Sequence, residues 1–332
     1  MIYPKFLKQG DTIGVTATSD GNADEIRKNR LNSAIKNFEQ RGYKICETAN
    51  VRTSYKGRSS NKEERARQFM SLIEDKNINA IITARGGDFL LEILSYIDFE
   101  KIKQNPKWVH GFSDTTGLSF CITTICEIAT SYGENFGEFG MVPWHRSLEN
   151  GLEILEGKRI IQTSFEKYQE NFYDRQTGLE GYTLDTKVEW KNDATLEGRV
   201  LGGCLDILTS LVGTKYDHVK EFVTKYKSDG ILWFLDNCEL TSEGVLRALW
   251  QLREAGWFEN AVGFVFGRTM TRKSSYDISF EEAVQTVLEG INVPIIFDSD
   301  IGHKPPQFTV INGAMAKVTS CDGKGTWEMY FK

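Results

Sequence analysis

Hydrophobic and polar positions in the first part of the chain predict strands that are followed by helices. Thr12–Thr18 is a short β-branched run, and residues 23–41 carry apolar side chains at helical spacing. An apolar strand then covers Ala80–Ala84, and the strand Trp108–Phe112 leads into a helix predicted over Thr115–Thr124. This alternation indicates βαβ units and a mainly parallel sheet.

The regular alternation stops in the middle of the chain and then returns. Residues 146–195 are rich in charged and aromatic side chains and predict a linker with surface loops, with a helix near Ser147–Leu155. Beyond them, strands such as the very apolar run Ile231–Leu235 again alternate with helices. We therefore predict an α/β protein with an N-terminal domain at 1–145 and a C-terminal α/β domain at 196–332.

Composition narrows the class of protein. The 332 residues are 40% hydrophobic and 26% charged, with a net charge of −6 and no block rich in Lys and Arg. These values predict a globular protein with no nucleic-acid partner. The N-terminus lacks the apolar core of a secretory signal, and no apolar run is long enough to span a bilayer, so no membrane association is expected. The six cysteines are scattered, with no Cys-x-x-Cys pair. They predict neither a zinc site nor a disulfide framework, and they suit a reducing cytoplasm.

Ser113 is the strongest local signal for chemistry. It lies in Gly111-Phe-Ser-Asp-Thr-Thr, at the end of a predicted strand. A sharp strand-to-helix turn would expose its hydroxyl, and the backbone N–H of Asp114 would face the charge that forms on an acyl oxygen. Alternatively, Ser113 and Asp114 only cap the next helix. Gly86 and Gly87 end a neighbouring strand, so they would bring a bare backbone N–H beside Ser113, or form a simple turn.

Histidine is scarce, which limits the choice of a general base. His303 lies in a proline-containing loop beyond a predicted strand, where a base would be held rigidly or would simply be solvated. His110 lies in the same strand as Ser113 and is interpreted as structural, and His145 and His218 lie in polar stretches.

The base needs a carboxylate that orients it. Asp236 ends the apolar strand Ile231–Leu235, and Glu239 is a nearby competitor. Asp236 also has the plainer interpretation of a helix-capping or turn residue.

Together these segments resemble one family of enzymes. The chain is similar to the LD-carboxypeptidase family of serine peptidases, which includes the MccF-type microcin-immunity hydrolases. The matching segments follow the family's order along nearly the whole chain: Gly10–Ser19, Arg85–Gly87, Gly111–Thr116, Leu201–Leu205, Leu232–Asn237 and Gly302–Thr309.

The resemblance implies a fold, a site and a setting. It implies an N-terminal Rossmann-like domain that carries the nucleophile, a smaller C-terminal α/β domain that carries the acid and the histidine, and an active site between them. By position Ser113 is the nucleophile and His303 the general base of a Ser–Glu–His triad. The N–H groups of Asp114 and of Gly87, or of Gly86 instead, form the oxyanion hole. Family members are cytoplasmic homodimers, and neither a metal nor a cofactor is implied.

The chain departs from the family at the third member of the triad. Where the family has Glu, this sequence has Asp236, whose side chain is one methylene shorter. Asp236 is the preferred candidate, because Glu239 would need a shifted turn to take its place. The change also leaves open a non-catalytic ligand-binding protein on the same scaffold.

The resemblance offers two kinds of substrate. The usual family reaction removes the terminal D-Ala from murein tetrapeptides at an L-to-D bond during cell-wall recycling. Arg85 is a candidate for binding the terminal carboxylate of that substrate, or it forms a salt bridge within the fold. The alternative is MccF-like hydrolysis of peptidyl or aminoacyl nucleotides in antibiotic self-immunity. An aromatic side chain such as Trp144, Tyr173 or Trp190 would then stack on the base, unless these side chains only pack within their own domain.

Overall fold

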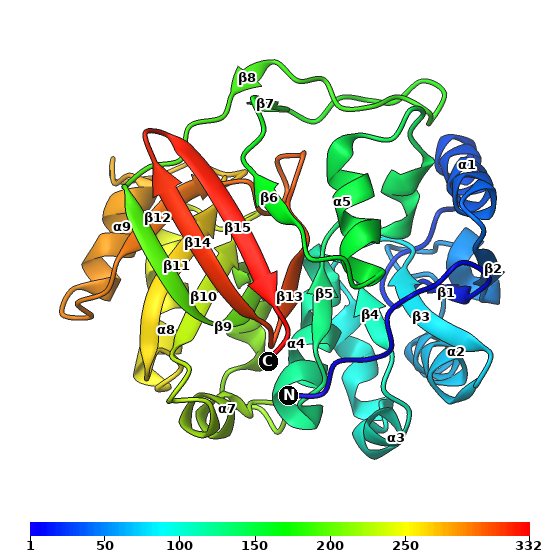
Figure 1. The fold of residues 1–332 in the computed structure, drawn as a ribbon, viewed down its shortest axis with the longest axis horizontal. Helices are drawn as coiled ribbons and strands as arrows, with labels where there is room; N and C mark the ends of the chain where they lie inside the picture. Colours follow the sequence, from blue (N-terminus) through cyan, green and yellow to red (C-terminus); the bar gives the residue numbers. More distant parts are fainter. The chain divides into compact units, whose positions relative to one another are not determined.

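The computed structural model describes all 332 residues, which divide into two compact units (Figure 1). The N-terminal unit contains Met1–Lys158 and Phe172–Thr183, and the C-terminal unit contains Arg159–Asn171 and Leu184–Lys332. The chain therefore passes from one unit to the other after residues 158, 171 and 183. No helix combines the length and the apolar character needed to cross a bilayer.

The N-terminal unit is built on a parallel sheet with the strand order β5-β4-β3-β1-β2. Its central strands are almost entirely buried, as the apolar runs of the sequence predict. The strands are β1 (Thr12–Thr16), β2 (Lys44–Glu47), β3 (Ile78–Thr83), β4 (Trp108–His110) and β5 (Thr130–Tyr132).

Helices connect these strands, and polar residues fix where several of them begin. Asp24 accepts a hydrogen bond from the backbone N–H of Arg27, and Asn61 accepts one from that of Glu64, so each caps its helix. The helices are α1 (Glu25–Gln40), η1 (Ala49–Arg52), α2 (Lys62–Glu74), η2 (Leu90–Tyr96), α3 (Phe99–Gln104), η3 (Ser113–Thr115), α4 (Thr116–Cys126), η4 (Phe136–Gly140) and α5 (Arg146–Leu155).

The C-terminal unit has a mixed sheet with the order β12-β11-β10-β9-β14-β15-β6. The first four strands are parallel. Beyond β9 each strand runs antiparallel to the one before it, in the order β14, β15 and β6 (Figure 1). The strands are β6 (Ile161–Thr163), β9 (Ala194–Cys204), β10 (Ile231–Asp236), β11 (Ala261–Gly267), β12 (Ile295–Ser299), β14 (Met315–Cys321) and β15 (Lys324–Tyr330). A short ribbon of β7 (Lys167–Tyr168) and β8 (Thr186–Lys187), and the strand β13 (Val310–Asn312), complete the set.

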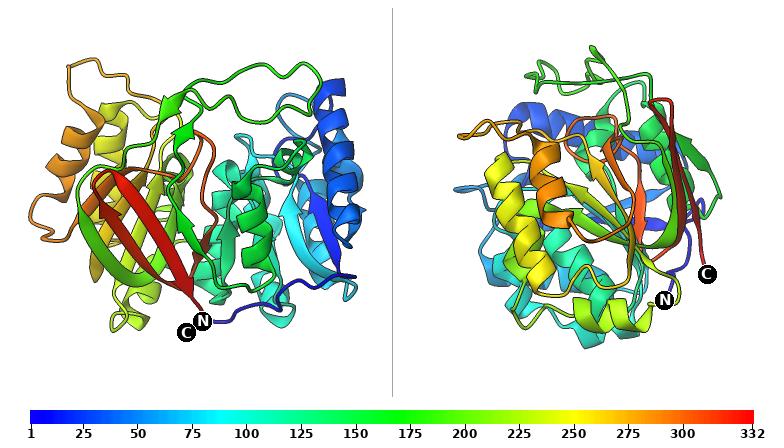
Figure 2. Two further views of the ribbon diagram at one scale, coloured as in Figure 1. Left: turned by 45° about the horizontal axis from the view of Figure 1, so that its top comes forward. Right: turned by 90° about the vertical axis from the view of Figure 1, so that its left-hand side faces the viewer.

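Helices α8 (Ser242–Glu254) and α9 (Phe280–Leu288) lie side by side on one face of this sheet (Figure 2). Ser279 and Glu282 form a capping box at the start of α9. The shorter helices α6 (Leu205–Leu208), η5 (Thr209–Leu211) and α7 (Val219–Lys225) follow β9 along the chain.

Residues 146–195, predicted as a linker with surface loops, are shared between the two units. The helix predicted near Ser147–Leu155 is α5, and β6 pairs with β15 at the edge of the C-terminal sheet. Residues 172–183 return to the N-terminal unit, where Arg30 donates to the carbonyl of Gly178 at 2.7 Å. The carboxylate of Glu138 accepts from both Arg30, at 2.8 Å, and Arg175, at 2.6 Å.

Candidate active site

Ser113 opens the turn between β4 and α4 with an unusual backbone. Its φ of 63° is left-handed, which costs a residue with a side chain roughly 1–3 kcal/mol. Gly111, with φ 154°, lets the chain reach this turn: a methyl group there would lie 2.0 Å from Thr83 Oγ1 and 2.7 Å from Asn135 Oδ1. The predicted helix over Thr115–Thr124 is therefore preceded by the one-turn helix η3, and α4 itself begins at Thr116. A serine with a strained backbone between a strand and a helix is typical of a nucleophile whose hydroxyl is exposed.

The two glycines after β3 have different neighbours. A methyl group on Gly86 would lie 3.1 Å from Ser113 Cβ and 3.2 Å from its hydroxyl oxygen, so the bare backbone of Gly86 adjoins the serine directly. A methyl group on Gly87 would lie 2.5 Å from the hydroxyl of Ser19 instead, and the φ of Gly87 is 147°.

The side chain of Asp114 anchors the turn that carries Ser113. It is buried and accepts hydrogen bonds from Ser19 Oγ at 2.5 Å and from the backbone N–H of Leu90 at 2.9 Å. Burial raises the pKa of Asp114 to about 6, although both hydrogen bonds act to lower it. Asp114 thus links the loop after β1 and the start of η2 to the turn that carries Ser113.

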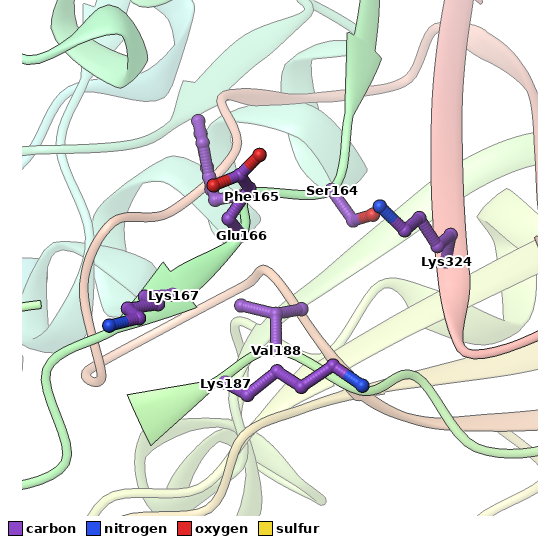
Figure 3. Close-up of a pocket in the computed structure, with 7 residues that line it drawn as sticks. All are labelled: Ser164, Phe165, Glu166, Lys167, Lys187, Val188 and Lys324. Carbon is purple, nitrogen blue, oxygen red and sulfur yellow. The ribbon is translucent and has the colours of Figure 1, made fainter. Parts of the chain in front are cut away.

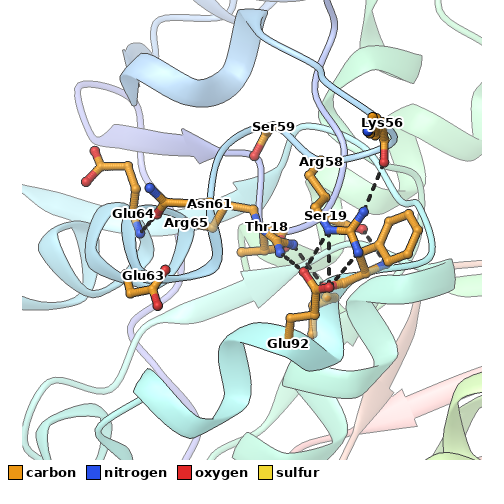
Figure 4. A network of polar contacts seen from close by, with 12 residues as sticks. Thr18, Ser19, Lys56, Arg58, Ser59, Asn61, Glu63, Glu64, Arg65 and Glu92 are labelled. Carbon is orange, nitrogen blue, oxygen red and sulfur yellow. Dashed lines mark hydrogen bonds and ion pairs between the residues drawn. The ribbon is translucent and has the colours of Figure 1, made fainter.

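A network of charged side chains supports the same loops (Figure 4). Arg65 is fully buried and donates to the carbonyls of Thr18 at 2.9 Å and Phe89 at 3.0 Å. The carboxylate of Glu92 accepts a hydrogen bond from Arg65 at 2.5 Å and a bidentate pair of hydrogen bonds from Arg58 at 2.6 and 2.9 Å. Because Thr18 and Phe89 precede Ser19 and Leu90, this network fixes the two groups that hold Asp114.

Arg85, the candidate for carboxylate binding, forms an ion pair within the N-terminal unit. Its guanidinium lies 2.5 Å from Asp20 Oδ2, and about a third of its side chain is exposed (34%).

In the C-terminal unit, Asp236 and His303 form a direct contact. His303 Nδ1 lies 2.6 Å from Asp236 Oδ2. Asp236 is the last residue of β10 and is fully buried, and His303 follows β12 with 8% of its side chain exposed. Glu239, the competitor for the same role, instead donates its backbone N–H to Asp206 at 2.8 Å. The shorter Asp side chain therefore reaches the imidazole.

This contact determines the electrostatics of His303. Burial acts to lower the pKa of His303, but the negative charge of Asp236 and its hydrogen bond outweigh burial and raise that pKa well above its usual value. The hydrogen bond also assigns a proton to Nδ1, because the carboxylate can only accept.

Gly302 allows Asp236 to lie close to His303. Its φ is 94°, and a methyl group there would lie 1.9 Å from Asp236 Oδ1. Sequence reasoning did not select Gly302, and its position directly before His303 was the available signal.

A second buried ion pair holds the loop that carries His303. Arg268 Nη1 lies 2.7 Å from Asp300 Oδ1, and Arg268 Nη2 donates to the carbonyls of Lys304 and Pro306 at 2.8 and 2.9 Å. Trp190 donates its indole N–H to the other oxygen of Asp300 at 2.8 Å. The loop is thus fixed on both sides of His303.

Two of the other three histidines, His110 and His145, make structural hydrogen bonds. His110 is buried, its Nδ1 lies 2.8 Å from Ser131 Oγ, and its Nε2 lies 2.9 Å from the carbonyl of Glu134. Burial lowers the pKa of His110 to about 4, which keeps the ring neutral. His145 caps α5, and His218 directly precedes α7.

The candidate aromatic side chains differ in exposure. Trp144 is buried and donates its indole N–H to the carbonyl of Phe139 at 2.7 Å. Trp190 is buried against Asp300. Tyr173 is exposed (48%), next to the exposed Phe172. Of the three candidates, Tyr173 alone leaves much of its ring accessible.

Two cysteines lie beside the Asp236–His303 pair, and the sequence did not point to either. Cys204 ends β9 and is paired in register with Asp236 on the neighbouring strand. Cys238 forms a side-chain hydrogen bond with His303. Candidate ligand atoms of Cys204, Asp236 and His303 all lie within 4.8 Å of one another.

A cavity of about 290 Å³ lies elsewhere in the C-terminal unit (Figure 3). It contains none of the candidate residues, and its lining combines three lysines with one carboxylate. The lining residues are Ser164, Phe165, Glu166, Lys167, Lys187, Val188 and Lys324.

A strained serine at a strand-to-helix turn, and a second α/β unit with a buried Asp–His pair, are features of two-domain serine hydrolases. Comparison with known families agrees. The model of the LD-carboxypeptidase N-terminal domain matches residues 13–133, and that of the LD-carboxypeptidase C-terminal domain matches residues 197–318. The protein belongs to the LD-carboxypeptidase family and is a hydrolase. The family resemblance inferred from the sequence is thereby confirmed.

Similar proteins include both types of family member. The chain is 24% identical to the microcin C7 self-immunity protein MccF of Escherichia coli, over 92% of this chain and 89% of that protein. It is also 24% identical to a probable murein peptide carboxypeptidase of Bacillus subtilis, over 96% and 92% of the two chains.

Solved structures confirm the predicted fold class. Microcin C7 self-immunity protein MccF in complex with aspartyl sulfamoyl adenosine is 25% identical, with a TM-score of 0.83 over 99% of each chain. Muramoyltetrapeptide carboxypeptidase from Oxalobacter formigenes is 21% identical, with a TM-score of 0.75 over 97% of this chain and 100% of that one.

Proposed function

We propose that the protein is a serine carboxypeptidase in which Ser113 is the nucleophile, His303 the general base and Asp236 the orienting acid. The observation that carries the proposal is the buried contact of 2.6 Å between His303 and Asp236, in a family of hydrolases. The left-handed backbone of Ser113 supports its assignment as the nucleophile.

In the proposed mechanism, His303 acts first as a general base and then as a general acid. His303 Nε2 takes the hydroxyl proton of Ser113 as the serine attacks the amide carbonyl, and Asp236 stabilises the imidazolium that forms. His303 then gives this proton to the departing amine. In the second half of the reaction His303 takes a proton from water, which attacks the acyl-enzyme, and returns it to Ser113 as the acid product leaves. The negatively charged oxygen of the tetrahedral intermediate accepts hydrogen bonds from the backbone N–H of Asp114 and from a second N–H of Gly87 or Gly86. Losing one such donor lowers the rate by roughly 100–1000-fold.

For the substrate, we propose a murein tetrapeptide, cut at the L-to-D bond before its terminal D-amino acid. Support comes from relatives such as the probable murein peptide carboxypeptidase of Bacillus subtilis and the muramoyltetrapeptide carboxypeptidase of Oxalobacter formigenes. Arg85 keeps about a third of its side chain exposed beside Asp20, so we retain it as the candidate for binding the terminal carboxylate.

A second candidate substrate is a peptidyl or aminoacyl nucleotide. The structural similarity is greater to MccF, with a TM-score of 0.83 against 0.75 for the muramoyltetrapeptide carboxypeptidase. Tyr173 and Phe172 are exposed aromatic side chains of the kind that stack on a nucleobase.

A fluorophosphonate probe tests the chemistry before any substrate is known. Wild type should be labelled, Ser113→Ala should not, and His303→Ala should react far more slowly. Ser119→Ala is the matched control, because Ser119 is a buried serine on α4. Equal labelling of wild type and Ser113→Ala would reject the assigned nucleophile, and no labelling of either would favour a ligand-binding protein.

Two substrates assayed side by side then test the specificity. The wild-type protein is incubated with murein tetrapeptide and separately with an aminoacyl sulfamoyl adenylate. Release of D-Ala from the first with no turnover of the second supports the murein carboxypeptidase. The reverse result assigns the protein to the MccF-like type.

A further inference from the structure

Three side chains with metal-binding atoms converge at the carboxyl ends of neighbouring elements in the C-terminal unit. Cys204 ends β9 and Asp236 ends β10, and these two residues are register partners on adjacent parallel strands. His303 comes from the loop after β12 and already contacts Asp236. Since the three residues come from separate elements, no sequence spacing reveals them, and the absence of Cys-x-x-Cys did not exclude them.

The three donor types suit one class of cation. A thiolate, an imidazole and a carboxylate are the ligands of Zn²⁺, and three protein ligands with one open position are common for it. Cys238 is a second thiol that is hydrogen-bonded to His303, but it is not part of this group of three. Mg²⁺ and Ca²⁺ prefer oxygen ligands and do not fit this set.

The geometry needs only small movements to accept such an ion. In a tetrahedral zinc site with bonds of about 2.0–2.3 Å, neighbouring ligand atoms lie roughly 3.3–3.5 Å apart. His303 Nδ1 and Asp236 Oδ2 are 2.6 Å apart, and all three ligand atoms lie within 4.8 Å of one another. The imidazole nitrogen and the carboxylate oxygen would move apart by roughly 0.7 Å. The thiol would move toward these two atoms by at most about 1.3 Å.

We propose that Cys204, Asp236 and His303 bind Zn²⁺, or a similar thiophilic divalent cation, and that the bound ion switches off His303 as a general base. On binding, the Cys204 thiol, which donates to Asp206 at 3.3 Å, releases its proton to the solvent, and a neutral imidazole nitrogen and the carboxylate complete the set. No electron is transferred, and a chelator reverses the change. Metal binding does not depend on the proposed function, whereas the inhibition rests on it.

A second cluster in the same unit provides the control. Asp193, Cys321 and Asp322 also bring candidate ligand atoms within 4.8 Å of one another, but all three residues are exposed. Exposed carboxylates are well solvated without a metal ion, so we expect no specific binding at this cluster. It therefore serves as the control for non-specific binding.

Binding is measured on the full chain, reduced with a phosphine that does not compete for metal. Co²⁺ is titrated first, because a thiolate ligand gives a charge-transfer band and tetrahedral coordination gives intense visible bands. Zn²⁺ then displaces Co²⁺, and competition with a chromophoric chelator gives its affinity. We expect both bands in wild type and in Cys321→Ser, and at least a roughly 10-fold weaker affinity in Cys204→Ser. No charge-transfer band in wild type, or a band lost only in Cys321→Ser, would overturn the site.

Inhibition is read separately as the ratio of fluorophosphonate labelling with and without Zn²⁺. The ratio should fall in wild type and in Cys321→Ser, recover with chelator, and stay near one in Cys204→Ser. If Zn²⁺ binds at Cys204 but leaves the labelling ratio of wild type unchanged, the switch is wrong. If no variant is labelled at all, the proposed function fails, while the cobalt spectra still decide the metal site.

Discussion

Gly302 and Asp236 are in such close contact that no side chain fits between them. A methyl group on Gly302 would lie 1.9 Å from Oδ1 and 2.2 Å from Cγ of Asp236. The carboxylate thus fills the space beside the backbone of the residue that precedes His303, and the contact between Asp236 and His303 depends on this glycine.

Replacing Gly302 by Ala should therefore disable the candidate site. The methyl group would push the Asp236 carboxylate away from His303 and add the strain of φ 94°. We expect fluorophosphonate labelling to slow by at least roughly 10-fold, since about 1.4 kcal/mol of lost stabilisation gives that factor.

Gly10 provides the control for this change. It has the same φ of 94°, but nothing lies within 4 Å of the position of its added methyl group. Gly10→Ala carries the backbone strain without the clash, so it should lose about 1 kcal/mol of stability and keep its labelling rate. Equal slowing in the two variants would show that the Gly302–Asp236 contact is irrelevant to reactivity.

The pH dependence of the reaction should reflect the effect of Asp236 on the pKa of His303. Because the pKa of His303 is raised well above its usual value, the neutral base is present only at higher pH. The acidic limb of kcat/KM should therefore have its midpoint above about 6.5. Asp236→Asn removes the charge, so this limb should move to lower pH while the rate falls by roughly 10,000-fold, as in other triads.

Stability gives an independent measurement of the same pair. A histidine with a raised folded-state pKa stabilises the fold fully below its unfolded pKa, and this stabilisation is lost as the pH rises through the folded value. The unfolding free energy of wild type should thus decrease with rising pH above about 6.5 more steeply than that of Asp236→Asn. Identical slopes would contradict the assigned pKa direction.

The backbone of Ser113 predicts a difference between two inactive variants. Glycine adopts a φ of 63° without strain, whereas alanine does not. Ser113→Gly should be more stable than Ser113→Ala by about 1 kcal/mol in chemical denaturation. Within helix α4 the order should reverse, because Ser119→Gly loses helix propensity relative to Ser119→Ala. The same order at both positions would argue against a strained turn.

Glu138 should be important for the stability of the N-terminal unit. It pairs with the buried Arg30 and with Arg175, so Glu138→Ala leaves both cations without their carboxylate. We expect a loss of about 3 kcal/mol, the lower end for buried pairs, because Arg175 is a third exposed. The exposed pair of Lys101 and Glu74 is the control, and Glu74→Ala should cost less than about 1 kcal/mol.

The sequence predicted those parts of the structure that depend on local patterns. The apolar runs at Ala80–Ala84 and Ile231–Leu235 predicted buried parallel strands, because strands buried on both faces are continuously apolar. The sequence favoured Asp236 over Glu239 because Glu239 would need a shifted turn, and in the structure the residue in contact with His303 is Asp236. The catalytic roles of these residues stay predictions.

Contacts between residues far apart in the sequence could not be predicted from local patterns. Gly302 matters because of a carboxylate 66 positions earlier, and Cys204 adjoins Asp236 only through strand register. The return of residues 172–183 to the N-terminal unit rests in part on backbone carbonyls that accept hydrogen bonds from Arg30, and backbone acceptors leave no mark in a sequence.

That return affects how the chain responds to cleavage. Residues 159–171 lie in the C-terminal unit, between two stretches of the N-terminal unit. A nick within 159–171 would therefore not free one unit from the other, but would divide the N-terminal unit itself. The fragments would stay joined through Arg30 and Gly178 and through Glu138 and Arg175, so a protease-nicked protein should migrate as one species until it is denatured.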